Sequence, residues 1–540
     1  MADYQKTESE RIADRFNLPP AFVEAVLKVR NASTMEGKLE AFKQEQYLVE
    51  NDPEAIEKQH ALGRLTARER VNRLLDPGSF EELDQLHRPH ETGINIGEAK
   101  GQGDGVIVGY GAIDGRPVTL WAQDGTVMGG TMATVHARKV TMIIEKALYA
   151  RTPIMALFDS EGVRPHDAIQ YPDFFSPGSI AYFKTLASGV VPKISMIMGP
   201  CTGEMAILAG LGDFIFMVKK TSYIHLMPHY PCPESQKIGD PEIQARITGC
   251  VDVLAENEEE CLKKCRQLLG YLPSNNMEKP PYVETGDDPN RRTDELMTIV
   301  PVDSTRPYNT YKLLSTLVDN GEFFEIKRHW ARNLITGFAR FGGHSCGIIA
   351  NNASDRGGCM TLDAADKISK FVRFCDAFGI PSIWIADTPA FLPAIEEETR
   401  GLIRHGSRMI QSNSECSVPH ILVVIRKNYG GGRLAMPGLT LGGDLSVAWP
   451  THEPGLMGAE GGVSIIYRNE LAAIKNIEER ERQKGHRVME LQWGLDMMIR
   501  EETQKIIDPR DTRIFLVRAL KWLRNKKKEW PTRKHENFRM

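Results

Sequence analysis

The chain has 540 residues, of which 67 are Lys or Arg and 71 are Asp or Glu. This length exceeds the roughly 250 to 300 residues at which a single hydrophobic core stops growing, so we expect at least two sizeable domains. The near balance of charge, without a long basic stripe, argues against a nucleic-acid-binding protein.

The N-terminal segment and the cysteines predict a cytoplasmic protein. Residues 1–16, MADYQKTESERIADRF, are charged and lack the apolar core of a signal peptide, and no run approaches the ~18 apolar residues of a membrane span. The nine cysteines are scattered, so we interpret them as reduced, mostly structural thiols. We interpret the basic tail at 525–540 as a solvated terminus, with contact to an anionic group as the alternative.

Helical periodicity dominates the chain to about residue 75, and the turn sequence DPGSF at 76–80 ends it. From residue 100 onward, β-rich runs such as VIVGYGAI and PVTLWAQ alternate with helical stretches such as ATVHARKVTMIIEKALYA. This alternation predicts an α/β fold that follows an α-helical N-terminal arm.

The two halves of the chain repeat one pattern. Landmark residues of the halves lie 228 positions apart: Pro153 and Pro381, Asp159 and Asp387, and the doublets Gly129-Gly130 and Gly357-Gly358, each nine residues before a lysine. Amphipathic periodicity alone does not explain shared Gly, Pro and Asp positions. We therefore predict two α/β domains of one fold, with a polar, Pro-rich linker around 275–310.

A glycine turn follows an apolar run in each half. PHILVVI at 419–425 precedes RKNYGGGRLAMPG at 426–438, and its counterpart PKISMIM at 192–198 precedes GPCTGEMA at 199–206. A strand that enters a helix through such a turn leaves backbone N–H groups free at the positive end of the helix dipole. The pattern therefore indicates a place that holds negative charge.

Three interpretations of these turns compete. A nucleotide phosphate loop would need GxxxxGK[ST] or GxGxxG, and neither turn contains either motif. A purely structural turn, in which glycine only permits tight packing, is the simplest alternative. An oxyanion hole stabilises the O⁻ of an enolate or tetrahedral centre through N–H groups and needs small residues. The duplication favours the oxyanion hole, since two copies suit two carbonyl groups that react with each other.

Two further motifs point to other chemistry. GHSCG at 343–347 matches the G-x-S-x-G nucleophile pattern, but we expect Ser345 in a strand after a hairpin turn, without the required elbow. His225, His229 and Cys232 have a spacing that could suit zinc, but the prolines between them disfavour a helix that would align them. No fourth ligand is evident, so we predict no metal site.

Long motifs along the chain resemble one family. They include GRLTARERVNRLLDPGSFEE at 63–82, ASGVVPKISMIMG at 187–199, NLITGFARFGG at 333–343 and AWPTHEPGLMGAEGGVSIIYR at 448–468. With these motifs the chain resembles the carboxyltransferase (β) subunits of biotin-dependent acyl-CoA carboxylases, such as propionyl-CoA carboxylase, and the related acyl-CoA decarboxylase subunits. The resemblance runs from about residue 55 to 535.

The resemblance implies two duplicated crotonase-like domains of the ClpP/crotonase superfamily. The helical arm would span 1–75, the acyl-CoA side domain 76–285 and the biotin side domain 286–540. It also implies a homohexamer built as a trimer of dimers, with active sites shared between subunits. The implied reaction passes the carboxyl group of carboxybiotin to the α-carbon of an acyl-CoA through an enolate.

The family's binding positions map onto residues of this sequence. The oxyanion hole for the coenzyme A thioester falls on the backbone N–H groups of Gly203 and Glu204. The hole for the biotin ureido oxygen falls on those of Gly431 and Gly432. The pocket position that helps to set acyl size corresponds to Leu434.

Three more residues fall where the family lines the coenzyme A site, namely Gly129, Gly130 and Arg164. Turn and surface residues without a binding role are the alternative for them. The chain lacks the Ala-Met-Lys-Met biotinylation motif and an ATP-grasp region. If biotin is used, it therefore comes on a partner, and the resemblance implies biotin carboxylase and biotin carboxyl carrier subunits.

The first glycine turn departs from the family, which carries Gly-Gly where this chain has Gly203-Glu204, and the loop at 225–249 also differs. Three hypotheses therefore stay open. The chain is the transferase component of an acyl-CoA carboxylase, or that of an acyl-CoA decarboxylase, which runs the reaction in reverse. Alternatively it is a biotin-independent crotonase-type enzyme, with Glu204 as a general acid or base, or a non-catalytic assembly subunit.

Overall fold

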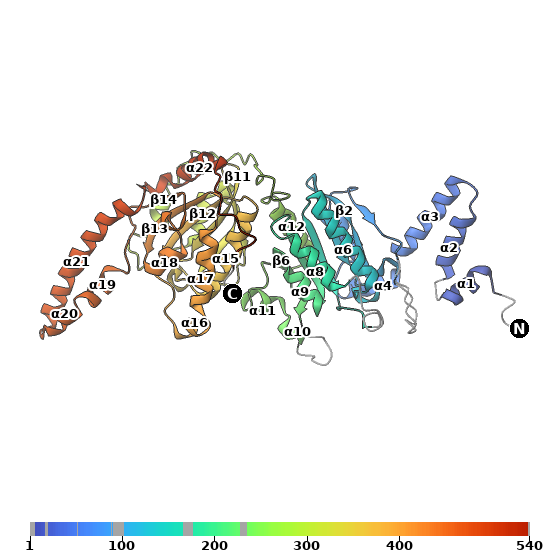
Figure 1. The fold of residues 1–540 in the computed structure, drawn as a ribbon, viewed down its shortest axis with the longest axis horizontal. Coiled ribbons are helices and arrows are strands. Elements are labelled where there is room, and N and C mark those ends of the chain that lie inside the picture. The colour runs from blue at the N-terminus through green and yellow to red at the C-terminus, as the bar shows by residue number, and fades with distance from the viewer. Residues whose placement is uncertain are drawn as a thin grey trace. The chain divides into compact units, whose positions relative to one another are not determined.

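The chain forms two compact units, Met1–Leu269 and Gly270–Met540, so the segment 275–310 belongs to the second unit. The structure is a computed structural model (Figure 1), which describes residues 6–16, 20–50, 52–87, 89, 102–165, 176–226 and 235–537. Among the described helices, none combines the length and hydrophobicity that crossing a membrane requires.

The N-terminal arm is helical, as its periodicity predicts. Its helices are α1 (Glu8–Phe16), α2 (Pro20–Asn31), α3 (Met35–Glu50), α4 (Pro53–Ala61) and α5 (Ala67–Leu74). Asp52 caps α4 by accepting hydrogen bonds from the N–H groups of Glu54 and Ala55. Thr66 and Glu69 form a capping box at the start of α5, which sets where this helix begins.

The first unit contains a mixed sheet in the order β1-β2-β3-β4-β5-β6-β8, with β7 paired to β5. The strands β1 to β3 are antiparallel, and the pairs from β3 to β8 are parallel. The strands are β1 (Glu81–Leu83), β2 (Val106–Ile113), β3 (Arg116–Gln123), β4 (Ile154–Ser160), β5 (Lys193–Thr202), β6 (Phe214–Val218), β7 (Tyr223–His225) and β8 (Val253–Ala255).

Helices cover this sheet, and α6 packs against β2 and β3. Strands β4, β5 and β6 are buried along their whole length, as expected for parallel strands covered on both faces. The helical elements are η2 (Gln102–Gly105), η3 (Met128–Gly130), α6 (Thr134–Ala150), α8 (Pro177–Leu186), α9 (Glu204–Gly210), α10 (Ser235–Ile238), α11 (Pro241–Arg246) and α12 (Glu258–Leu269).

The second unit contains a sheet in the order β15-β14-β13-β12-β11-β10-β9. Its β9 to β11 are antiparallel and its remaining pairs are parallel, so it has the same sequence of strand directions as the first sheet. The strands are β9 (Phe323–Ile326), β10 (Leu334–Phe341), β11 (His344–Asn351), β12 (Ser382–Thr388), β13 (His420–Asn428), β14 (Leu445–Ala448) and β15 (Lys505–Ile506).

The helices of the second unit include α15, which packs against β10 and β11 as α6 does in the first unit. The elements are α13 (Leu296–Ile299), α14 (Thr310–Leu317), η4 (Asp319–Gly321), η5 (Arg356–Gly358), α15 (Leu362–Ala377), α16 (Ile395–Thr399), α17 (Leu402–Ser414), α18 (Gly430–Ala435), η6 (Leu439–Leu441), α19 (Ala459–Ile466), α20 (Arg468–Ala473), α21 (Ile477–Glu502), η7 (Pro509–Asp511), α22 (Thr512–Trp522) and η8 (Leu523–Asn525). The predicted α/β class is confirmed.

Repeated hydrogen bonds show that the similarity of the two units reaches individual side chains. In each unit an aspartate that precedes the first strand accepts hydrogen bonds from two backbone N–H groups of a hairpin turn. Asp76 accepts from Asp114 and Gly115 in the β2–β3 turn. Asp319 accepts from Gly342 and Gly343 in the β10–β11 turn. The buried lysines repeat as well, since Lys139 donates to the carbonyl of Val106 and Lys367 donates to that of Leu334.

The C-terminal tail is held to the second unit rather than only solvated. Lys526 Nζ lies 2.7 Å from an Asp444 carboxylate oxygen and donates to the carbonyl of Val418. Arg533 pairs with Glu415 at 3.1 Å. Two basic residues of the tail, Lys526 and Arg533, thus pair with acidic residues of the same unit.

We predict that the protein loses stability in acid, because two of its histidines are buried in the neutral form. Burial lowers the pKa of His136 to about 3, helped by the nearby Arg164, and burial likewise lowers that of His420 to about 3, helped by Lys526. Both rings are neutral in the folded state, whereas the unfolded chain takes up protons below about pH 6.5. Each histidine is therefore expected to cost about 1.4 kcal/mol of folding free energy per pH unit as the pH falls from about 6.5 towards 3.

Denaturant unfolding of the full chain between pH 7 and pH 4 measures this effect. His420→Gln, which cannot take up the proton, should reduce the pH dependence of the free energy of unfolding. An unchanged slope in this variant would show that His420 is not the group that titrates.

Candidate active site

The first glycine turn links β5 to α9. Gly203 stands between them with φ +58°, a conformation that side chains disfavour. Its N–H donates to the carbonyl oxygen of His225 in β7 at 3.0 Å, so this amide is already used. The N–H of Glu204 belongs to the first turn of α9 and has no partner among the residues that the structure describes, and the Glu204 side chain is exposed.

The second glycine turn links β13 to α18. Gly430 has φ +45° and donates its N–H to the carbonyl oxygen of Gly455 at 3.1 Å. The N–H of Gly432 donates to the carbonyl of Tyr429 at 2.7 Å. Within the described parts of the chain, the N–H of Gly431 finds no acceptor. The Gly431 amide is therefore available, as the Glu204 amide is in the first turn.

The strand register aligns the two turns. In the first sheet Ser160 pairs with Cys201, and in the second sheet Thr388 pairs with Asn428. Counting on from these pairs, Gly203 corresponds to Gly430, and Glu204 corresponds to Gly431. The two available amides are therefore equivalent in the repeat. The sequence mapping, with Gly203 and Glu204 in one hole and Gly431 and Gly432 in the other, is offset by one residue between the halves.

Close contacts with neighbouring side chains also favour glycine at two positions of the second turn. A Cβ at Gly431 would lie 2.8 Å from Cδ2 of Phe391, and one at Gly432 would lie 2.8 Å from Cγ2 of Thr388. Around Gly203 a Cβ would meet nothing within 4 Å, so only its backbone conformation calls for glycine. The second turn is the tighter of the two.

The residues predicted at the coenzyme A site have internal roles in the structure. A Cβ at Gly130 would lie 2.1 Å from the carbonyl oxygen of Asp159, so this glycine permits a close backbone approach, and Gly129 precedes it in η3. Arg164 is buried, pairs with Asp104 at 2.8 Å and donates to the carbonyl of Thr131. These contacts fix the loop beside β4, and a role in binding coenzyme A stays a prediction.

Leu434, predicted to help set acyl size, lies on α18 and is 47% exposed. It stands three residues after Gly431 on the same helix. Its role in choosing the acyl group likewise stays a prediction.

The two other motifs carry no assembled site in the described structure. Ser345 lies in β11 after the β10–β11 hairpin turn, as predicted, and its hydroxyl donates to the carbonyl of Pro281 at 3.1 Å. His225 lies in β7, whereas His229 and Cys232 fall outside the described residues. Over the described ranges, no cluster of three or more His, Cys, Asp or Glu side chains could hold a metal ion.

Asp159 and Asp387, landmarks of the sequence repeat, form buried ion pairs beside the turns, a role that the sequence motifs do not predict. Asp159 pairs with Arg70 at 2.7 Å, and Asp387 pairs with Arg426 at 2.9 Å. All four side chains are at most 2% exposed. The signal available in the sequence was an acidic residue at the end of an apolar strand, where a buried carboxylate needs a cationic partner.

The chain matches the family model of the carboxyl transferase domain over residues 58–538. The chain belongs to the carboxyl transferase family. By this membership it is an acyl-CoA carboxyltransferase, so the prediction made from the sequence motifs is confirmed. The turns described above are therefore the glycine turns of a carboxyltransferase.

Several characterised relatives resemble the chain over nearly their whole length. The methylmalonyl-CoA decarboxylase subunit alpha of Veillonella parvula is 40% identical over 89% of this chain and 94% of its own. The propionyl-CoA carboxylase carboxyltransferase subunit of Haloferax mediterranei is 38% identical over 94% of this chain and 99% of its own. A solved structure of the transcarboxylase 12S hexamer with hydrolysed methylmalonyl-coenzyme A matches with a TM-score of 0.89 and 37% identity, over 94% of this chain and 100% of that one.

Proposed function

We propose that this chain transfers a carboxyl group between biotin, carried on a separate partner subunit, and the α-carbon of an acyl-CoA. The observation that carries the proposal is the pair of equivalent available amides, Glu204 N–H and Gly431 N–H, one at each glycine turn. Each can donate to an oxygen that becomes more negative during the reaction. The first donates to the thioester oxygen and the second to the ureido oxygen of biotin.

The two turns act on the substrates in complementary ways. Bound carboxybiotin would supply the carboxyl group and accept the α-proton. The Glu204 N–H stabilises the enolate oxygen of the acyl-CoA, while Gly203 gives the turn the backbone conformation that aims this amide. Gly431 and Gly432 let the ureido group approach closely, because no side chain stands between it and the backbone.

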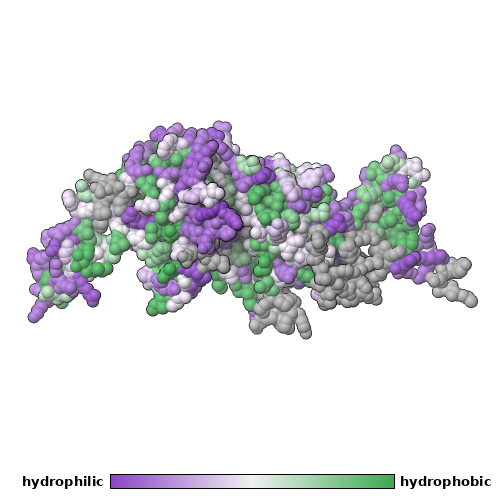
Figure 2. Space-filling view, in the orientation of Figure 1, coloured by the Kyte–Doolittle hydropathy of each residue, from purple (hydrophilic) through white to green (hydrophobic). Residues whose placement is uncertain are grey.

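We extend the proposal to the fold family of the two units and to the assembly of the chain. We infer that the two units are crotonase-like domains and that the chain forms a homohexamer, in line with the hexameric transcarboxylase 12S structure. Figure 2 shows hydrophobic surface around α19, where Ile465 and Ile466 are exposed, and Trp493 of α21 is 71% exposed. Such side chains suit burial between subunits.

We also place the protein in the cytoplasm. The eight cysteines within the described residues are free thiols, and most of them are buried. Free thiols are usual in a reducing compartment. The partners would be a biotin carboxylase and a biotin carboxyl carrier subunit.

The test is purification of the native complex, followed by a streptavidin blot and by ATP- and bicarbonate-dependent carboxylation of a panel of acyl-CoAs. We expect a biotinylated partner and activity with a short acyl-CoA such as propionyl-CoA, the substrate in the names of several relatives. A complex without a biotinylated partner, together with no transfer from a carboxyacyl-CoA to free biotin, would reject the proposed function.

A decarboxylase is the second candidate, because a methylmalonyl-CoA decarboxylase subunit is 40% identical to the chain. One site serves both directions of transfer. The native complex separates the two, since a carboxylase complex consumes ATP and bicarbonate, whereas a decarboxylase complex releases CO₂ from methylmalonyl-CoA without ATP.

Glu204→Gln tests whether the side chain of Glu204 takes part in the reaction. Because the proposal uses only the backbone N–H, we expect kcat to change less than about tenfold, whereas loss of a general acid or base typically costs about 10²- to 10⁴-fold. Steady-state kinetics with a carboxyacyl-CoA and free biotin measure it. A loss of a hundredfold or more, with native circular dichroism, would instead support a general acid or base at the thioester.

A further inference from the structure

The strand that leads into each glycine turn has a bulge opposite a buried aspartate. In the second sheet, pairing passes from Ala386 with Val424 to Thr388 with Asn428, so that Asp387 alone faces three residues of β13. The first sheet has the same irregularity around Asp159, between the pairs Phe158 with Ile197 and Ser160 with Cys201. Bulges redirect a strand and often stand beside active sites. Here each one sets the direction in which the chain enters the turn.

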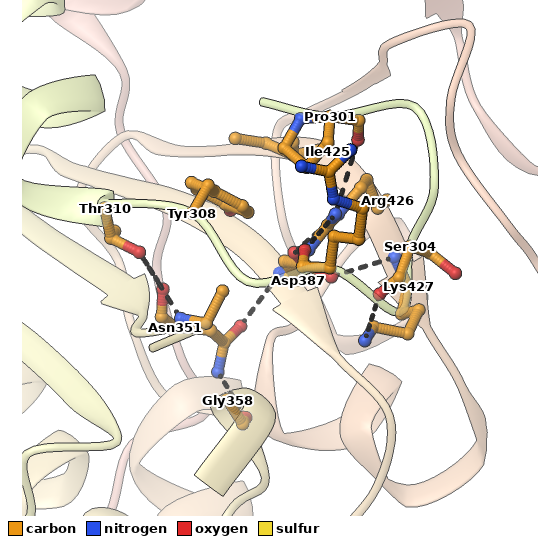
Figure 3. Close-up of polar contacts among 12 residues, drawn as sticks. Pro301, Ser304, Tyr308, Thr310, Asn351, Gly358, Asp387, Ile425, Arg426 and Lys427 are labelled. Atoms are coloured by element: carbon orange, nitrogen blue, oxygen red, sulfur yellow. Dashed lines mark hydrogen bonds and ion pairs between the residues drawn. The ribbon is translucent and has the colours of Figure 1, made fainter. Parts of the chain in front are cut away.

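In the second unit the Asp387 carboxylate fills the bulge (Figure 3). One oxygen accepts from Nε and Nη2 of Arg426 at 3.0 and 2.9 Å, and the other accepts from the backbone N–H of Lys427 at 3.2 Å. Both donors belong to the bulged part of β13. Removing the carboxylate would leave Nε and Nη2 of Arg426 and the N–H of Lys427 without this acceptor.

Neighbouring segments brace the same aspartate. The side chain of Asn351 accepts from the backbone N–H of Asp387 at 3.1 Å and donates to the carbonyl of Gly358, which ties the ends of β11, η5 and β12 together. Arg426 Nη1 donates to carbonyls in the segment 301–306, including that of Arg306 at 2.9 Å. Lys427 Nζ donates to the carbonyl of Ser304 at 2.9 Å.

In the first unit the buried carboxylate of Asp159 has hydrogen-bond partners from other parts of the chain. Position 199, the counterpart of Arg426, is a glycine, and a Cβ there would lie 2.0 Å from a carboxylate oxygen of Asp159. The arginine comes instead from α5, where Arg70 donates to Asp159 at 2.7 Å. Gln59 donates to the same carboxylate at 2.8 Å, and Gln123 accepts the N–H of Asp159 at 3.3 Å, as Asn351 does in the second unit.

The chain just after each aspartate is in direct contact with the strand end or turn that follows the bulge. The N–H of Tyr429 donates to the carbonyl of Thr388, the residue after Asp387, at 3.3 Å, and Gly432 packs on the same threonine. In the first unit Gly162 packs on Thr202, the last residue of β5. A shift of either aspartate would therefore move the amide of its own turn.

From this geometry we infer that Asp159 and Asp387 are positioning residues, each of which aims the available amide of its own half. Asp387 and Arg426 set the Gly431 amide, and Asp159 with Arg70 of the N-terminal arm sets the Glu204 amide. Because the two arginines come from unrelated elements, the two substrate positions are tuned separately. The assignment of substrates to the halves rests on the proposed function.

The matched variants Asp159→Asn and Asp387→Asn test this inference in the full chain. Transfer from methylmalonyl-CoA to free biotin is measured while each substrate is varied in turn. Asp387→Asn should lower kcat/KM for biotin about tenfold to a hundredfold, the size expected for a displaced binding group, and leave the dissociation constant of the acyl-CoA within about twofold. Asp159→Asn should weaken acyl-CoA binding and leave the KM for biotin unchanged.

The inference is overturned if each variant affects the two substrates equally, or if both variants have wild-type kinetics. The proposed function, in contrast, is overturned if the wild-type chain does not transfer the carboxyl group to biotin. Glu259→Gln, at an exposed ion pair with Arg73, is the control for a change of charge alone. If an aspartate variant does not fold, Gln123→Ala and Asn351→Ala replace it, since each removes the side chain that accepts the backbone N–H of one aspartate. The same difference between the two substrates is then expected.

Discussion

Gly432→Val is expected to abolish carboxyl transfer to and from biotin while acyl-CoA binding persists. A Cβ at this position would lie 2.8 Å from Cγ2 and 3.3 Å from the carbonyl oxygen of Thr388, and valine adds two further methyl groups. The turn must move to relieve this contact, and the Gly431 amide moves with it. Loss of one oxyanion donor typically costs about 10²- to 10³-fold in kcat, and blocked access for the ureido group adds to this loss.

The measurement pairs transfer kinetics with calorimetric binding of the acyl-CoA. Gly485→Val is the matched control, since Gly485 of α21 has nothing within 4 Å of an added Cβ and lies in a helix. Loss of both transfer and acyl-CoA binding, or retention of both, would reject the assignment of the second turn to the biotin side.

Arg70→Met is expected to destabilise the first unit by about 3–5 kcal/mol, because it leaves buried carboxylates without their cation. Arg70 is fully buried and bonds to Asp159 and to Glu258, each at 2.7 Å, and these two carboxylates are 2% and 5% exposed. Its pKa is raised despite burial, because these two acids favour the charged guanidinium. The arginine of α5 therefore joins the N-terminal arm to the core of the unit.

Guanidinium unfolding, followed by circular dichroism, measures this loss. Arg73→Met on the same helix is the control, since its ion pair with Glu259 has side chains that are 47% and 71% exposed. Exposed pairs contribute about 0–1 kcal/mol, so the control should unfold nearly as the wild type does. Similar losses in the two variants would contradict a special role for the buried charges.

The sequence by itself determined the class of fold, the duplication and the place of the two turns. Apolar runs that end at glycines, together with Pro and Asp marks repeated at one spacing, reflect strands whose burial constrains every residue along them. Asp159 and Asp387 belong to this signal because each is the second-last residue of a buried strand. The prediction that Ser345 is not a nucleophile also used local information. A Gly-Gly hairpin turn followed by a β-rich run places Ser345 in a strand, whereas a nucleophile elbow needs a turn from a strand into a helix.

Only the tertiary structure decided which amide of each turn is available. The N–H of Gly203 is taken by His225, and that of Gly430 is taken by Gly455, segments that follow the turns by many residues. Such pairings depend on how distant parts of the chain meet, so local sequence does not encode them. The same holds for the partners of the buried aspartates: Arg426 stands on the neighbouring strand, whereas Arg70 arrives from the N-terminal arm, and only packing shows that both neutralise equivalent charges.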